Sequence, residues 1–227
     1  EFRRVLFRSN SAEVAAALAA AQSRGVETET VLDPTGNPKL DRQGRAKTRV
    51  RDHVAEHRSR LQAADDKRRA VLNWLDNTAD YAMTLDIPSW VVKDPRASQA
   101  CGISTIREAI DATRYNNEFF IQNRRGRDAG GCRILNVLQG DGHSSAEDWY
   151  QTMKHYCDPA QYPGRHFDGW AMGGQNMCDV ELILRRLVAL RYDGLLQTGI
   201  HDWMHFLGTS KLEWAVLLTV IQNAVRR

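Results

Sequence analysis

FDGWAMGG, residues 167–174, is the stretch that decides the fold. It is a short apolar segment that runs directly into Gly173 and Gly174. Strands that are apolar on both faces are typical of parallel sheets covered by helices. Three further segments share this design, each mostly apolar, closed by polar or glycine residues, and followed by a helical pattern: YAMTLDIP (81–88), CRILNVLQG (132–140) and WMHFLGTS (203–210).

The segments between and after these strands predict helices over about residues 103–122, 145–156, 179–191 and 211–226. Alternating strands and helices form right-handed strand–helix–strand units. Such units fit either an open doubly wound sheet or part of a closed (β/α)8 barrel. The chain has no nucleotide-type GxGxxG motif, and polar residues end the strands, which favours the barrel. We therefore expect the α/β class and an incomplete (β/α)8 TIM-type barrel of about four to five units.

The N-terminal part of the chain has a different character. EFRRVLFRS (1–9) matches a translated sequencing adapter, so we exclude it from the fold as a scar. Residues 10–49 are expected to be poorly defined helix and loop, because DPTGNPKLDRQG (33–44) concentrates proline, glycine, Asn and Asp. Thr48 to about Asn77 lacks proline and glycine and predicts a helix, either continuous or broken once. The barrel domain is expected over residues 50–227, truncated at both ends.

Composition excludes several classes of protein. The chain has 227 residues, 42% of them hydrophobic and 26% charged, as in ordinary soluble proteins. No apolar run approaches the length of a membrane span and no signal peptide is visible, so we expect a cytoplasmic protein without membrane partners. Four cysteines stand singly, which indicates neither a disulfide framework nor a zinc site: Cys101, Cys132, Cys157 and Cys178.

The net charge of +3 does not by itself indicate a nucleic-acid partner. Lys and Arg are nevertheless concentrated between Lys39 and Arg69 and in NRRGR (123–127). Such clusters are more often solvated faces than phosphate contacts.

Polar or glycine residues close each predicted strand. Because the carboxyl ends of parallel strands meet at one edge of the sheet, we expect these residues to lie together. A carboxylate accepts N–H donors from a purine edge, a carboxamide donates to a carbonyl, glycines expose the backbone, and leucine can cover a ring. The set indicates a slot for a guanine-like base: Asp86, Gln139, Gly140, Gly173, Gly174, Leu207 and Gly208.

Taken singly, these residues also suit plain structural roles. Asp86 before Ile-Pro could be a cap, Gln139 a turn residue, and Leu207 part of the core.

Several of these motifs resemble a known family. VLQG (137–140), FDGWAMGG (167–174) and FLGTS (206–210) resemble the successive strand-end motifs of the tRNA-guanine transglycosylase (queuine tRNA-ribosyltransferase) superfamily. ADYAMTLDIP (79–88) resembles the aspartate strand that precedes them, and the resemblance covers about residues 50–227. LDIPSW and LGTSKLEWAVLLTVIQ look more like the branch of phages and bacterial genomic islands, which inserts 7-deazaguanines into DNA.

The resemblance implies a glycosyltransferase that exchanges guanine in nucleic acid, DNA rather than tRNA, for a 7-deazaguanine such as preQ0 or preQ1. An aspartate nucleophile would form a covalent glycosyl intermediate after the target base is turned out of its stack. Residue by residue, Asp86 would bind the N1 and N2 edge of the base, and Gln139 and the Gly174 amide its carbonyl side. Gln175 would contribute its backbone, and Leu207 with Gly208 would cover one ring face.

The reactive half of such a site has no counterpart in this sequence. The resemblance places the general acid/base aspartate upstream of Glu13, the nucleophile after the 211–227 helix, and a structural zinc cluster farther on. We therefore expect no catalytic residue, no metal and no cofactor within residues 1–227, and no activity from this chain alone. The implied partners are DNA or tRNA and the free 7-deazaguanine base in a bacterial or phage-infected cell, and a homodimer is one assembly open to the chain.

Two other interpretations of the sequence remain open. The chain could be a noncatalytic subunit of the same fold that binds nucleic acid or a partner enzyme. It could also be an unrelated metal-dependent barrel enzyme that uses His143, His201 and His205. His201 and His205 have the i, i+4 spacing of helical metal ligands but lie in a strand pattern. Asp141 and His143 follow Gln139 into a loop, where an ordinary turn is the plainer interpretation and substrate contact the alternative.

Overall fold

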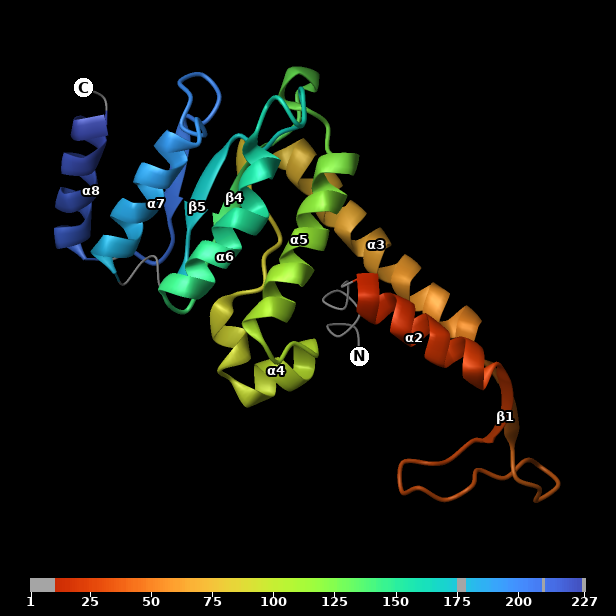
Figure 1. The fold of residues 1–227 in the computed structure, drawn as a ribbon. Helices are drawn as coiled ribbons and strands as arrows, with labels where there is room; N and C mark the ends of the chain where they lie inside the picture. The colour runs from red at the N-terminus through yellow and green to blue at the C-terminus, as the bar shows by residue number, and fades with distance from the viewer. Residues whose placement is uncertain (1–10, 175–178, 210, 226–227) are drawn as a thin grey trace.

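The computed structural model describes residues 11–174, 179–209 and 211–225. Figure 1 shows a body of parallel strands and covering helices, from which two long helices lead to a projecting hairpin. The adapter-like residues 1–9 and Gln175 lie outside the described residues.

The body is built on a four-stranded parallel sheet, as the sequence predicted. The strands lie in sequence order, β3-β4-β5-β6, and every neighbouring pair is parallel. They are shorter than the predicted segments because the polar and glycine residues after them form turns at the carboxyl edge. Their bounds are β3 (Tyr81–Met83), β4 (Arg133–Leu138), β5 (Gly169–Met172) and β6 (Trp203–Phe206).

The sheet is strongly curled. The ring centroids of Tyr81, on β3, and Trp203, on β6, lie 4.8 Å apart. In a flat sheet these outer strands would be separated by three strand spacings, about 14 Å. Gly169 on β5 lets the backbone of β6 come close, because a Cβ at this position would stand 2.2 Å from the carbonyl oxygen of Trp203. The described sheet is thus a half-barrel, and its closure into a TIM-type barrel stays a prediction.

Helices follow the strands as expected and cover the convex face of the sheet. Residues of this face, such as Ile134 and Trp170, pack with Phe120 and Trp149 from the helices into the main core. A smaller apolar cluster of Leu135, Val137 and Ala171 forms on the concave face. The predicted helices are found within a few residues of their expected bounds as α5 (Ile106–Asn123), α6 (His143–Met153), α7 (Val180–Tyr192) and α8 (Leu212–Val225).

Three short helical elements were not anticipated: η1 (Ser89–Val92), α4 (Pro95–Cys101) and η2 (Arg127–Ala129). They lie in the connection after Asp86 and shortly after α5, and are too short to show the periodicity that the sequence pattern relies on. A further short element, η3 (Lys154–Cys157), directly continues α6 and lies mostly within the helix predicted over residues 145–156.

The N-terminal part is more ordered than expected. α2 (Ser11–Arg24) leads into β1 (Val26–Thr30), which pairs in antiparallel fashion with β2 (Thr48–Asp52). Only then does the long helix α3 (His53–Thr78) begin, capped by the Asp52 side chain, which accepts from Ala55 N. The expected helix start at Thr48 was wrong, because pairing with β1 takes its first five residues into a strand. That strand crosses the suggested boundary between residues 49 and 50. Within the described residues, no helix is long and apolar enough to cross a membrane.

Candidate functional site

Asp86 and Gln139 meet at the carboxyl edge of the sheet. The side-chain Nε2 of Gln139 donates a hydrogen bond to Asp86 Oδ2, and Gln139 Oε1 accepts from the backbone N–H of Ser89 at 2.9 Å. Ser89 Oγ in turn donates to the carbonyl oxygen of Gly140 at 3.3 Å. Together with Gly174, these residues form the edge cluster: Asp86, Ser89, Gln139, Gly140 and Gly174.

Helix α5 holds the segment that carries Asp86. Thr113 Oγ1 accepts from Ile87 N at 2.9 Å, and Asn116 Nδ2 donates to the carbonyl of Leu85 at 2.8 Å. Asn116 is itself held by the buried Arg68 of α3, whose Nε donates to Asn116 Oδ1 at 2.8 Å. The backbone on both sides of Asp86 is therefore fixed by buried groups, and the carboxylate is presented by a rigid segment.

Burial changes the acidity of Asp86. It desolvates the carboxyl group and raises its pKa to about 6, while the hydrogen bond from Gln139 acts in the opposite direction. The group therefore loses its proton just below neutral pH. Above that pH a partly buried carboxylate acceptor stands at the edge of the sheet.

The two glycines after β5 lie against the same residues. A Cβ at Gly173 would stand 3.0 Å from Leu207 Cδ1 and 3.5 Å from Gln139 Cδ. A Cβ at Gly174 would stand 2.7 Å from the Gly140 carbonyl oxygen and 2.9 Å from Ser89 Oγ, and Gly174 has a φ of +60°. Gly174 is therefore closed to a side chain by its φ and by the Gly140 backbone, with or without a ligand, whereas a side chain at Gly173 would press only on the flexible Leu207 side chain.

The structure thus brings Asp86, Gln139, Gly140, Gly173 and Gly174 into one neighbourhood, with Leu207 beside Gly173. Leu207 is half-buried and packs on the concave-face cluster. Gly208 follows with a φ of +76° and open space around it.

Ser89 was missed by sequence reasoning, since one serine after a proline carries no distinctive signal. Its role depends on the turn that folds it back onto Gln139, fifty residues away in the chain.

A shallow, open hollow of about 590 Å³ lies beside the edge cluster rather than within it. It is lined by Trp90, Lys93, Asp94, Pro95 and Arg96, which directly follow Ser89. Lys93 Nζ reaches across to Asp141 Oδ2 at 3.6 Å, which joins this segment to the loop after β4. The Gln139 side chain bridges Asp86 and Ser89, so a base at the edge cluster would have to lie against this bridge.

The histidines of the alternative metal site do not come together. His201 Nε2 is bonded to the carbonyl of Cys157 at 2.7 Å, and Gln197 N donates to its Nδ1 at 3.2 Å. His205 is exposed on β6, and His143 lies 3.5 Å from Asp179. Asp141 accepts from Ser145 Oγ at 2.6 Å, in the turn that begins α6. Within the described residues, the ring nitrogens of these three histidines do not lie close enough together to hold one metal ion.

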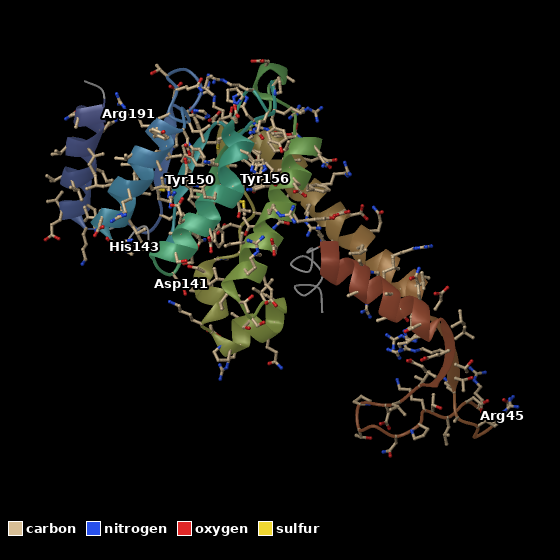
Figure 2. The ribbon with its side chains drawn as sticks, viewed as in Figure 1. Arg45, Asp141, His143, Tyr150, Tyr156 and Arg191 are labelled. Atoms are coloured by element: carbon tan, nitrogen blue, oxygen red, sulfur yellow. The ribbon has the colours of Figure 1, made fainter. Side chains whose placement is uncertain are left out.

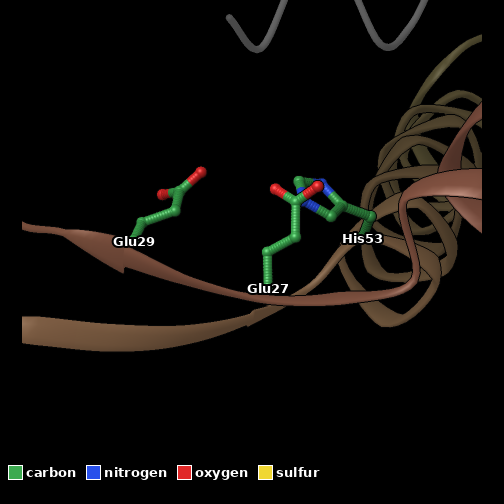
Figure 3. A group of neighbouring side chains, drawn as sticks. All are labelled: Glu27, Glu29 and His53. Carbon is green, nitrogen blue, oxygen red and sulfur yellow. The ribbon is translucent and has the colours of Figure 1, made fainter.

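One group of potential ligands lies elsewhere, at the base of the hairpin. Figure 3 shows Glu27, Glu29 and His53 side by side. Their charges are already matched: Arg51 pairs with Glu29 at 2.8 Å, and Glu27 accepts from His53 and Arg24. The hydrogen bond from His53 is the main cause that lowers the pKa of Glu27. Ion pairing accounts for this group, which fastens β1 to β2 and α3.

By its fold, the chain is an α/β protein with a curled parallel sheet, and comparison with known proteins adds no narrower class. No protein-family model matches the sequence, and neither the curated proteins nor the solved structures contain a match.

Proposed function

We propose that the edge cluster binds a guanine-type base. The observation that carries the proposal is the contact between Gln139 and Asp86, which sets an amide donor directly beside a carboxylate acceptor.

Gln139 Nε2 has two N–H groups. The bond to Asp86 uses one of them, and no other bond from Nε2 is found within the described residues. The second is suited to a carbonyl oxygen. Guanine presents along one edge an acceptor, O6, followed by the donors N1–H and N2–H. A donor at Gln139 next to an acceptor at Asp86 complements that order, whereas adenine presents the reverse order.

In the proposed reaction, the base belongs to DNA and is exchanged for a 7-deazaguanine such as preQ0. The support is the resemblance of the strand-end motifs together with their placement at the carboxyl edge, where parallel α/β folds bind ligands. A base paired in DNA has to be turned out before it can reach such a site. In this reaction the described residues would supply recognition of the base.

Equilibrium binding of free bases tests the proposal without requiring chemistry. Isothermal titration of the chain should show that guanine, 7-deazaguanine and preQ0 bind, since all three share the N1, N2 and O6 edge. Adenine and hypoxanthine, which lack part of that edge, should bind at least about tenfold more weakly, because a buried polar group would lose its partner. Affinity should rise as the pH passes 6, where Asp86 ionises.

Asp86→Asn should remove the preference for guanine over adenine, while circular dichroism shows an intact fold. The matched control is Asp141→Asn in the neighbouring loop, which should bind guanine like the original chain. Equal affinity for adenine and guanine, or unchanged binding by Asp86→Asn, would refute the proposal.

A further inference from the structure

The hairpin of residues 26–52, termed the arm, projects from the body. β1 and β2 pair from Val26↔Asp52 to Thr30↔Thr48. Five paired residues extend the arm by about 17 Å before its tip begins. Figure 1 shows it beyond the far ends of α2 and α3, and Figure 2 places Arg45 at its outer end, well away from Asp141 on the body. Most residues of its two strands are exposed or half-buried, so the arm is open to another molecule along its length.

The tip of the arm has a defined structure. It consists of two successive segments with the same pattern, LDPTGNPK (32–39) and LDRQGRAK (40–47). In each, the aspartate folds a turn: Asp33 Oδ1 accepts from Thr35 N and Asn37 N, and Asp41 Oδ1 from Gln43 N and Arg45 N, at 2.8–2.9 Å.

Backbone hydrogen bonds join the two turns to the strands. They run from Lys39 N to Val31 O, from Lys47 N to Lys39 O and from Val31 N to Lys47 O, a closed set of three at 2.7–2.8 Å. The tip is therefore ordered before any partner arrives, and a partner would meet a preformed surface.

Positive charge is concentrated in the outer part of the arm. Residues 31–50 contain five Lys and Arg and two Asp, a formal charge of +3, whereas the whole arm of residues 26–52 has a formal charge of +1 because Glu27, Glu29 and Asp52 lie at its base beside Arg51. Both carboxylates of residues 31–50 are turned into their own loops, and Asp41 also pairs with Arg45 at 3.2 Å. Lys39, Arg42 and Lys47 are exposed, and no ion pair joins them to a carboxylate within the described ranges.

We propose that the arm binds double-stranded DNA, with Lys39, Arg42 and Lys47 on phosphate groups. The major groove of B-form DNA admits a two-stranded ribbon, whereas the corresponding groove of A-form RNA is too narrow and deep. The ribbon has one face that carries Glu27 and Glu29 and another that is uncharged except at Asp52. The second face carries Thr28, Thr30 and Thr48 beside Val26 and Val50. DNA binding by the arm extends the proposed function, since duplex DNA is the polymer that would carry the base. The observations behind it come from the arm and not from the edge cluster.

The test is equilibrium binding of a fluorescent 25-base-pair duplex by polarisation over a series of salt concentrations. The variant Lys39→Ala/Arg42→Ala/Lys47→Ala should bind at least about tenfold more weakly. Each phosphate contact contributes about 0.9 to the slope of log K against log salt, so the slope should fall by about three. The control Arg185→Ala/Arg191→Ala/Lys211→Ala removes the same charge from the exposed surface of α7 and the start of α8, and should change affinity less than threefold.

A second variant removes the tip without altering the strands. Thr30 and Thr48 face each other, so residues 31–47 can be replaced by Asn-Gly, the preferred two-residue hairpin turn. This variant should lose duplex affinity to the same extent as the triple variant. Equal losses in the control, or full affinity without the tip, would overturn the proposal, and equal tip-dependent binding of duplex RNA would overturn the choice of DNA. Binding of free guanine should be unchanged in both arm variants, which separates this test from that of the edge cluster.

Discussion

Gln139 links Asp86 to Ser89: its amide nitrogen donates to the Asp86 carboxylate while its oxygen accepts from the Ser89 backbone. The bridge fixes the orientation of the carboxamide, because exchanging its nitrogen and oxygen would set two acceptors against each other at Asp86 and two donors at Ser89. It also ties together two strand ends that belong to different parts of the chain. The chemistry of the candidate site therefore depends on a side-chain contact rather than on one motif.

The pH dependence of stability should report the partly buried carboxyl group of Asp86. Its pKa of about 6 lies above the value near 3.9 of an unfolded chain, so the folded state holds its proton more tightly. This contribution favours folding fully below about pH 4 and is lost as the pH rises to about 6. Asp86→Asn keeps an acceptor for Gln139 and carries no charge. It should raise the free energy of unfolding above pH 6 by on the order of 1–3 kcal/mol, measured by urea denaturation.

The matched substitution Asp141→Asn should act in the opposite direction. The hydrogen bond from Ser145 is the main cause that lowers the pKa of Asp141, so its ionised form is favoured in the folded state. Removing that charge should lower stability at neutral pH. A gain in stability from both substitutions would contradict the assignment of a raised pKa to Asp86.

Gly174 should tolerate a side chain less well than Gly208. Both have positive φ angles, +60° and +76°, so alanine costs about 1–2 kcal/mol at either position for the left-handed backbone. At Gly174 the new Cβ would also press on the Gly140 carbonyl and Ser89 Oγ, whereas at Gly208 it would meet open space. Urea denaturation should show a loss for Gly174→Ala that exceeds the loss for Gly208→Ala by about 1 kcal/mol or more. Equal losses would mean that the strand ends are less closely packed.

The buried ion pair of Arg124 and Asp168 should be essential for stability. Arg124 Nη2 lies 2.8 Å from Asp168 Oδ2, both side chains are at most 2% exposed, and Asp168 also accepts from Ile134 N. Asp168→Ala would leave the guanidinium buried without its counter-ion, and should cost about 3–5 kcal/mol. The exposed pair of Arg185 and Glu181 provides the control, since Glu181→Ala should cost less than about 1 kcal/mol. Comparable costs would show that Arg124 is solvated.

Thiol labelling should separate the cysteines by burial. Cys132 and Cys157 are buried, and desolvation raises the pKa of both thiols, that of Cys132 to about 11. Cys101 is only half-buried. Under native conditions Cys101→Ser should therefore remove one reactive thiol in a dithionitrobenzoate assay, while Cys132→Ser and Cys157→Ser should leave the fast-reacting count unchanged. A fast-reacting thiol at Cys132 would show that the chain just before β4 is open to solvent.

The sequence by itself determined the order of strands and helices in the body and the parallel sense of the sheet. These follow from local patterns: apolar segments such as CRILNVLQG, the turn residues that end them, and the helical periodicity between them. It also placed Asp86, Gln139 and Gly174 at one edge, because parallel strands end on the same side.

Only the tertiary structure decided which groups contact each other. The bridge through Gln139 and Ser89, and the curl that brings Tyr81 to Trp203, join residues that are 50 and 122 positions apart. The start of α3 was misjudged for the same reason, since no proline or glycine separates Thr48–Asp52 from the helical segment after it, and these residues become a strand by pairing with Val26–Thr30. Local sequence fixes what a segment prefers, whereas pairing and packing between distant segments supply the free energy that selects its final partners.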